Sequence, residues 1–163
     1  MRKNHKAWNL GKNGLSLCVI TILLILFVGC GNRIDYSLPH NPIRFETGTF
    51  VNPNDSEDTY LSISYHGRTY ILYGTLNSTV TGKNIGNCLG FIVQEGVEME
   101  ESRVFLLNED PDANYLCTLE TEGIMNQPFF YRAINTVGKE IFTPEYITDL
   151  EYDFWMGGEH TQS

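Results

Sequence analysis

Short segments in which apolar and polar residues alternate, separated by turn-forming residues about every ten positions, most constrain what this chain can fold into. Residues 59–65 carry an apolar side chain at every second position, which is the period of a half-buried strand. A tight turn around Gly67 follows, and residues 69–76 supply a returning strand. The pattern therefore predicts a β-hairpin over residues 59–76.

The same criteria predict further strands along the chain, at residues 45–51, 88–94, 103–107, 115–120 and 128–136. Polar or glycine-containing turns separate them, at residues 52–58, 77–87, 95–101, 108–114 and 137–139. Closely spaced strands with few helical signals are typical of antiparallel sheets. We expect a mostly β fold (β-rich α+β), with an antiparallel sheet and one or two short helices.

One segment carries a good signal for a helix start. Thr143 is a favoured N-cap, Pro144 a favoured first helical residue, and Glu145 complements the positive end of the helix dipole. This predicts a short helix over residues 144–150. The apolar residues of this region are expected to pack onto the sheet: Tyr146, Ile147, Leu150, Phe154 and Trp155.

The N-terminal region carries an uncharged apolar run at residues 15–29, preceded only by basic charges. The run is shorter than the roughly 17–25 residues of a membrane-spanning helix. A basic segment followed by a run of this length is typical of a signal peptide. The absence of acids before Asp35 favours export of everything that follows.

The run ends in Phe27-Val28-Gly29-Cys30, which resembles the lipobox of bacterial lipoprotein precursors, although Phe27 stands where that family usually has Leu. The resemblance covers residues 1–30 only. It implies cleavage between Gly29 and Cys30 and a diacylglycerol on the Cys30 thiol, and two acyl chains hold a protein stably on a membrane. The chain would then be lipid-anchored on the extracytoplasmic face of the cell membrane. An uncleaved N-terminal anchor is the alternative.

These signals divide the chain into four parts: a signal peptide at 1–29, the lipidated Cys30 with a flexible tether at 30–44, one β-rich domain at 45–157 and a frayed tail at 158–163. The tether is assigned from Pro39, Pro42 and the lack of apolar periodicity.

Charge limits the partners of the exported part. Four of the 11 basic residues lie in the leader, which leaves seven basic against 20 acidic residues, a net charge of −13. Such a surface repels nucleic acid and anionic lipid head groups and suits a basic partner, either a protein or a small ligand, or a divalent cation. No cofactor is indicated beyond the covalent lipid.

Two cysteines remain after Cys30. Cys88 and Cys117 both lie in strand-like surroundings, so they form either one disulfide or two buried free thiols. A disulfide would require the two strands to be neighbours. Cys18 lies inside the leader and is expected to leave with it.

No local motif specifies catalysis. The histidines His40, His66 and His160 lack metal-ligand spacing, and we interpret them as solvated loop residues. Two acidic turns carry hard oxygen ligands without the spacing of a calcium loop, so solvated turns are favoured over Ca²⁺ sites. Their acids are Asp55, Glu57 and Asp58 in one turn and Glu109, Asp110 and Asp112 in the other. The strip at 126–132 is either a recognition surface or an ordinary alternating strand, and its periodicity favours the strand.

The sequence alone therefore favours a membrane-anchored lipoprotein with a non-catalytic binding or interaction domain. The alternative is an extracytoplasmic hydrolase whose site is assembled from scattered side chains, namely Glu98, Glu100, Arg103 and His66. A weaker alternative is an immunity or inhibitor lipoprotein that acts against a basic toxin, which charge alone suggests.

Overall fold

The computed structural model describes residues 33–76, 78–122, 127–148, 150 and 154–155. Cys30, the leader and the predicted tail at 158–163 lie outside the described residues. The chain divides into two compact units, Met1–Arg33 and Ile34–Ser163. Only the second unit is described below. No helix among the described residues is long and apolar enough to cross a membrane.

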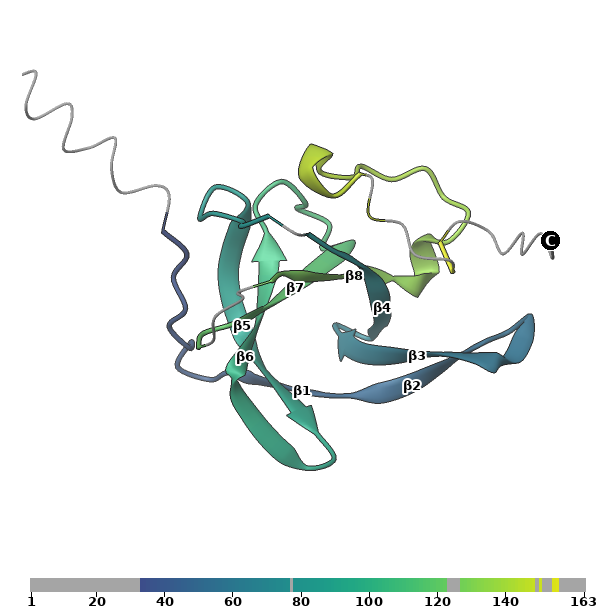
Figure 1. Cartoon of the computed structure of the whole chain (residues 1–163), viewed down its shortest axis with the longest axis horizontal. Coiled ribbons are helices and arrows are strands. Elements are labelled where there is room, and N and C mark those ends of the chain that lie inside the picture. Colours follow the sequence, from purple (N-terminus) through teal and green to yellow (C-terminus); the bar gives the residue numbers. More distant parts are fainter. Residues whose placement is uncertain (1–32, 77, 123–126, 149, 151–153, 156–163) are drawn as a thin grey trace, which may run out of the picture. The chain divides into compact units, whose positions relative to one another are not determined.

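The second unit is mostly β, as the alternating pattern predicts (Figure 1). Its strands are β1 (Ile43–Glu46), β2 (Gly48–Asn52), β3 (Asp55–Tyr65), β4 (Arg68–Thr75), β5 (Ile85–Gln94), β6 (Val97–Leu107), β7 (Tyr115–Glu120) and β8 (Phe129–Ala133). Two short 3-10 helices follow, η1 (Ile134–Thr136) and η2 (Glu145–Ile147). The predicted hairpin is confirmed as β3 and β4.

The eight strands form one curled sheet in the order β1-β5-β6-β7-β8-β4-β3-β2. The two end strands, β1 and β2, are consecutive in the chain, with only Thr47 between them, so the ends of the sheet meet. All pairs are antiparallel except β1 with β5, which is parallel. The single predicted strand at 45–51 is therefore wrong in one respect, because it is interrupted at Thr47 and its two parts pair with different strands.

The predicted acidic turn at 95–101 is also too long. Only Glu95 and Gly96 form the turn, with φ of 51° and 80°, and β6 begins at Val97. The carboxylates on this part of β6 are exposed while Met99 is half-buried. The sequence did not indicate a strand here because Glu98, Glu100 and Glu101 make the segment look like a polar turn.

The predicted helix at 144–150 is a single 3-10 turn, η2, among its described residues. A helix of this length gains too few hydrogen bonds to form by itself. The predicted burial is nevertheless correct: Ile147 is fully buried, and Tyr146, Leu150 and Trp155 pack on the same cluster. Phe154 packs edge-on against Phe50 and Tyr60. The last predicted strand likewise ends early, at Ala133, and continues as η1.

Side chains from the two faces of the sheet form two separate clusters. The inner cluster fills the curl with one or two side chains from each strand except β2: Phe45, Ile63, Tyr70, Ile92, Val104, Leu116, Tyr131 and Ala133. The outer cluster contains Tyr73, Ile85, Phe105, Leu107, Tyr115, Cys117, Leu119, Phe130 and Ile147. Chain segments without strands cover the outer cluster, whereas the inner one is enclosed by the sheet itself.

Most of the expected tether, from Ile34 on, belongs to this body. Ile34 and Tyr36 pack on the outer cluster, and the Tyr36 ring meets Phe105 edge-on at 5.7 Å. Arg103 Nε donates to the Tyr36 carbonyl at 3.3 Å. β1 begins at Ile43, inside the range assigned to the tether. The sequence does not reveal this because isolated apolar side chains can pack without any periodic pattern.

Candidate ligand-binding pocket

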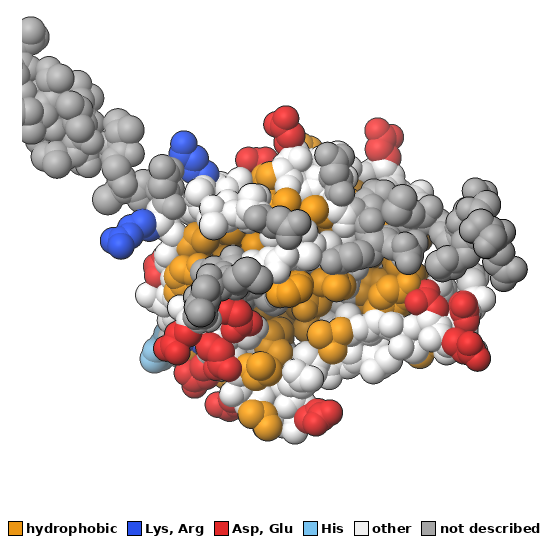
Figure 2. All heavy atoms as spheres, in the orientation of Figure 1, with side chains coloured by type: hydrophobic (Ala, Val, Ile, Leu, Met, Phe, Trp, Pro, Cys, Tyr) orange, Lys and Arg blue, Asp and Glu red, His pale blue; other side chains and the backbone are white. Residues whose placement is uncertain are grey.

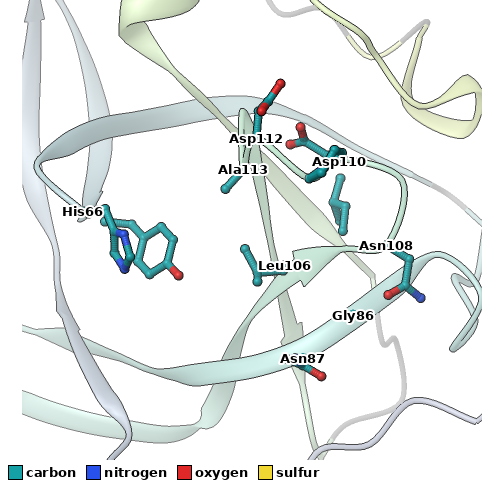
Figure 3. Close-up of a pocket in the computed structure, with 11 residues that line it drawn as sticks. His66, Gly86, Asn87, Leu106, Asn108, Asp110, Asp112 and Ala113 are labelled. Atoms are coloured by element: carbon teal, nitrogen blue, oxygen red, sulfur yellow. The ribbon is translucent and has the colours of Figure 1, made fainter.

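A pocket of about 400 Å³ opens at the end of the curled sheet where β3 and β6 end and β5 begins. We call it the mouth pocket. Its lining comes from four places: Tyr65 and His66, Gly86 and Asn87, Leu106 to Asn108, and Asp110 to Ala113. Figure 3 shows His66 on one side of this space, Asp110, Asp112 and Ala113 on the other, and Leu106 between them.

The first wall is the turn between β3 and β4. His66 and Gly67 have φ of 48° and 74°, which is the backbone of a two-residue hairpin turn with both residues left-handed. The Tyr65 and His66 rings lie 4.1 Å apart with 35° between their planes. The Tyr65 ring also packs against Phe45 of the inner cluster at 6.1 Å. The turn thus presents a stacked aromatic pair to the pocket.

The opposite wall is the β6–β7 loop, residues 108–114, and it is built around a buried carboxylate. Asp110 is 3% exposed and accepts hydrogen bonds from the Tyr115 backbone N–H at 2.6 Å and from Asn114 Nδ2 at 3.3 Å. Burial raises the pKa of Asp110 above its usual value, although these hydrogen bonds oppose the shift. The predicted solvated turn is therefore wrong at Asp110, which holds the loop from inside.

Arg68 joins the two walls. Its Nη1 donates to the carbonyls of Asp112 and Ala113, both at 2.9 Å, and its Nη2 donates to Asn114 Oδ1 at 2.9 Å. The Tyr70 hydroxyl donates to the same Ala113 carbonyl at 2.7 Å. These bonds hold Ala113 at φ 49°, a left-handed backbone that alanine rarely adopts. The loop is therefore fixed before any ligand arrives.

The third wall, at the start of β5, is fixed by Asn108. Its amide Nδ2 donates to three carbonyls, those of Gly82, Lys83 and Ile85, at 3.0 to 3.1 Å. A Cβ at Gly86 would lie 2.9 Å from Asn108 Oδ1, so the strand approaches this side chain as closely as glycine allows. Among the described residues, two side-chain amides line the pocket, those of Asn108 and Asn87, and the exposed Asn87 is the one that does not hold the wall in place.

The residues of the hydrolase alternative are not brought together in the described body. Glu98 forms an exposed ion pair with Arg44, Glu100 is exposed elsewhere on β6, and Arg103 is tied to Tyr36. Of the four, His66 lines the mouth pocket and the others do not. The described residues also contain no group of three or more His, Cys, Asp or Glu side chains that could hold a metal ion.

The cysteine pair is not bridged, and both thiols are free. Cys88 and Cys117 each pair with Phe105, from β5 and β7 on either side of β6. Two strand spacings put their Cα atoms about 10 Å apart, beyond the reach of about 7 Å that a disulfide allows. Burial raises the pKa of both thiols, Cys117 most strongly, so neither is an activated nucleophile.

The recognition strip at 126–132 is an interior strand, and its residues before Gln127 lie outside the described part. Arg132 is 9% exposed and stacks on the Trp155 ring at 4.7 Å, with Tyr73 and Tyr115 nearby. Its Nε donates to Thr136 Oγ1 at 2.9 Å. Arg132 therefore packs the C-terminal segment onto the sheet and is not a surface anchor.

A second pocket, of about 490 Å³, lies between the segment before β1 and the start of β5. Asp35, Ser37, Asn87 and Cys88 are among its lining residues. The Cys88 thiol donates weakly to the Gly90 carbonyl at 3.7 Å. We rank this pocket below the mouth pocket because its N-terminal wall is held by the long-range side-chain hydrogen bond from Arg103 Nε to the Tyr36 carbonyl, whereas Arg68 makes several to the β6–β7 loop.

Comparison with known proteins gives no further guidance on this pocket. A scan against protein-family models, a search of curated proteins and a search of solved structures each found no match to this chain. The functional argument therefore rests on the residues themselves.

The sequence singled out His66 as part of the hydrolase alternative and Asp110 as a possible Ca²⁺ ligand in an acidic turn, and it did not single out Arg68, Asn108 or Ala113. The partners of Arg68 lie 44 to 67 positions away, so no local pattern reports them. A carboxylate shortly before a strongly apolar strand, such as Asp110 before Tyr115, is the one local signal that could have indicated a buried capping side chain.

Proposed function

We propose that this chain is a lipid-anchored lipoprotein of the extracytoplasmic membrane face, and that its β body is a non-catalytic binding domain. The compact unit starts at Ile34, four residues after Cys30. Cleavage before Cys30 would therefore keep the whole of this unit on the lipidated product. This supports the lipoprotein assignment, which otherwise rests on the leader and on Gly29-Cys30.

The observation that carries the binding role is the fixed geometry of the mouth pocket. The Arg68 guanidinium donates hydrogen bonds to backbone and amide oxygens of the β6–β7 loop. The buried Asp110 carboxylate accepts a hydrogen bond from the Tyr115 N–H at the end of the same loop. Preorganised walls reduce the entropy lost on binding and so favour affinity. The pocket also lies within the size range of small-ligand sites, about 300–1,000 Å³.

The anchor is tested by metabolic labelling with an alkyne fatty acid. We expect label on the wild type, loss of label and accumulation of precursor in Cys30→Ser, and unchanged labelling in Cys18→Ser. Cys18→Ser is the matched control because it removes a thiol from the leader itself. An unlabelled wild type, or label that survives Cys30→Ser, would contradict the lipoprotein assignment.

The binding role is tested by photo-crosslinking in the native membrane. A benzophenone amino acid at the exposed pocket residue Asp112 should form a defined adduct on illumination. The same residue at Glu57, which is exposed on β3 and does not line the mouth pocket, is the control. Adducts at neither position, or the same adducts at both, would argue against a ligand site at the mouth pocket.

A further inference from the structure

We propose that the mouth pocket binds an organic cation, an ammonium or guanidinium group carried on a short apolar stem. This inference rests on the proposed binding role and specifies the chemistry of its ligand. The cation could belong to a free amine or to a Lys or Arg side chain of a peptide, and both sources present the same group to the pocket.

The charge of the lining favours a cation. Asp110 and Asp112 contribute two carboxylates, and no Lys or Arg is among the described residues that line the pocket. The nearby Arg68 guanidinium donates to the Asp112 and Ala113 carbonyls and to Asn114 Oδ1, which are uncharged, so its positive charge offsets one of the two carboxylates and leaves the region net negative. Burial raises the pKa of Asp110, so a cation beside this carboxylate would favour its ionised form.

The aromatic pair supplies a second attraction. A cation placed over the face of an aromatic ring is stabilised by the negative charge density of that face. The His66 ring lies across the pocket from Asp110 and Asp112 (Figure 3), and the Tyr65 ring, 4.1 Å from that of His66, lines the same pocket. A cation between these walls would meet the ring of His66 on one side and lie in the negative field of Asp110 and Asp112 on the other. Leu106 and Ala113 offer apolar contact to its stem.

The rest of the body increases the local concentration of cations. The exported part carries a net charge of −13. Figure 2 shows carboxylates at several places around the margin of one face, with apolar side chains across its middle. Arg44, which is exposed, is neutralised by Glu98. A negative field attracts cations to the body, and the aromatic pair then selects those with an apolar stem.

The test is an NMR titration of the full lipidated protein in nanodiscs, observing the His66 side chain. The probes are agmatine, an arginine-containing tetrapeptide, and the same peptide with citrulline, a neutral isostere of arginine. We expect the His66 signal to shift either with both agmatine and the arginine peptide or with the arginine peptide alone. The citrulline peptide should bind at least about tenfold more weakly than the arginine peptide, since a charge-assisted contact is lost. Agmatine binding indicates a free amine, and binding of the peptide alone indicates a peptide source.

Two variants separate the pocket from the general field. Asp112→Asn and Asp55→Asn each remove one exposed carboxylate, but only Asp112 lines the pocket. Asp112→Asn should weaken binding about fivefold, whereas Asp55→Asn should leave it within about twofold, because exposed charges far from the site are screened. His66→Asn keeps a residue suited to the left-handed turn and should also weaken binding by removing the ring.

Three results would overturn the proposal: no shift with either cationic probe, equal binding of citrulline and arginine peptides, or equal loss in Asp112→Asn and Asp55→Asn. None of these would by itself remove the binding role, because photo-crosslinking at Asp112 tests that role with whatever ligand the membrane supplies. Crosslinking without cation binding would mean that the pocket takes a ligand of another class.

Discussion

Two connections in this sheet, the β5–β6 turn and the β6–β7 loop, both hold a non-glycine residue in the left-handed backbone region. Glu95 has φ 51° and Ala113 has φ 49°. Glu95 is exposed and is followed by Gly96, so it belongs to a two-residue hairpin turn that its own strands define. Ala113 lies in a seven-residue loop, and its carbonyl accepts hydrogen bonds from Arg68 and Tyr70, which are far away in the sequence.

The difference separates local from tertiary causes of structure. A turn such as Glu95-Gly96 follows from residue types that stand next to each other. The β6–β7 loop follows from a buried carboxylate and a distant guanidinium that act on the same few residues. Backbone strain that is held by tertiary contacts is common at functional sites, and this loop lines the mouth pocket.

The largest expected effect concerns the buried carboxylate. Asp110→Ala should lower the free energy of unfolding by about 3 kcal/mol, because it leaves the buried Tyr115 N–H without an acceptor. Glu95→Ala should change it by less than about 0.5 kcal/mol, since that side chain is exposed. Urea denaturation followed by circular dichroism measures both. Equal effects would show that the loop is no more dependent on side chains than the turn.

The next effect concerns two arginines. Arg68→Ala should lower the free energy of unfolding by about 2 kcal/mol, because it removes several hydrogen bonds to loop oxygens. Arg44→Ala should cost at most about 1 kcal/mol, since its ion pair with Glu98 is exposed. Amide hydrogen exchange should locate the loss of Arg68→Ala in residues 108–114. Exchange that rises uniformly over the sheet instead would contradict a local clamp.

The fold was predictable because its strands alternate. The hairpin of β3 and β4 appears where the apolar period places it, although β3 begins at Asp55, inside the predicted turn at 52–58, and β7 appears where an apolar run bounded by turns places it. The interruption at Thr47 was not predictable, because it depends on which strands the two parts pair with. The same holds for Cys88 and Cys117, whose separation by β6 is a property of strand order and not of either strand.

The site was much less predictable than the fold. His66 could be placed in a turn, but its position opposite Asp110 depends on how the sheet curls. Asp110 was grouped with solvated acids because its loop is rich in polar residues, and only the structure shows that its side chain is buried. Arg68 stands next to a turn glycine, where a solvated side chain is the ordinary expectation. Sites assembled from loops at one end of a sheet leave such weak local signals.

A smaller effect links the loop to pH. Burial raises the pKa of Asp110 in the folded protein above the ordinary value near 3.8. The folded state therefore binds more protons than the unfolded state above pH 3.8, and stability falls as pH rises until the raised pKa is passed. The slope contributed by one group is at most about 1.4 kcal/mol per pH unit.

Asp110→Asn removes this titration, and Glu95→Gln, which neutralises an exposed carboxylate in the β5–β6 turn, is the control. As pH rises from 3.8 through the raised pKa, the wild type should lose stability relative to Asp110→Asn. Above that pKa the difference in stability should stay constant. Urea titrations at several pH values measure it. A pH-independent difference would mean that the Asp110 carboxyl titrates alike in both states.

The smallest effect tests the local turn. Glu95→Asn should raise the free energy of unfolding by about 0.5 kcal/mol relative to Glu95→Gln. Both substitutions remove the same charge, but asparagine adopts the left-handed region more readily, and Asn-Gly is the preferred pair for a two-residue hairpin turn. Because Glu95 is followed by Gly96 and its φ is 51°, the native backbone already matches that preference. Thermal unfolding of the two variants side by side measures the difference. If Glu95→Asn is no more stable than Glu95→Gln, the turn is held by its strands and not by its own residues, and the contrast with the β6–β7 loop disappears.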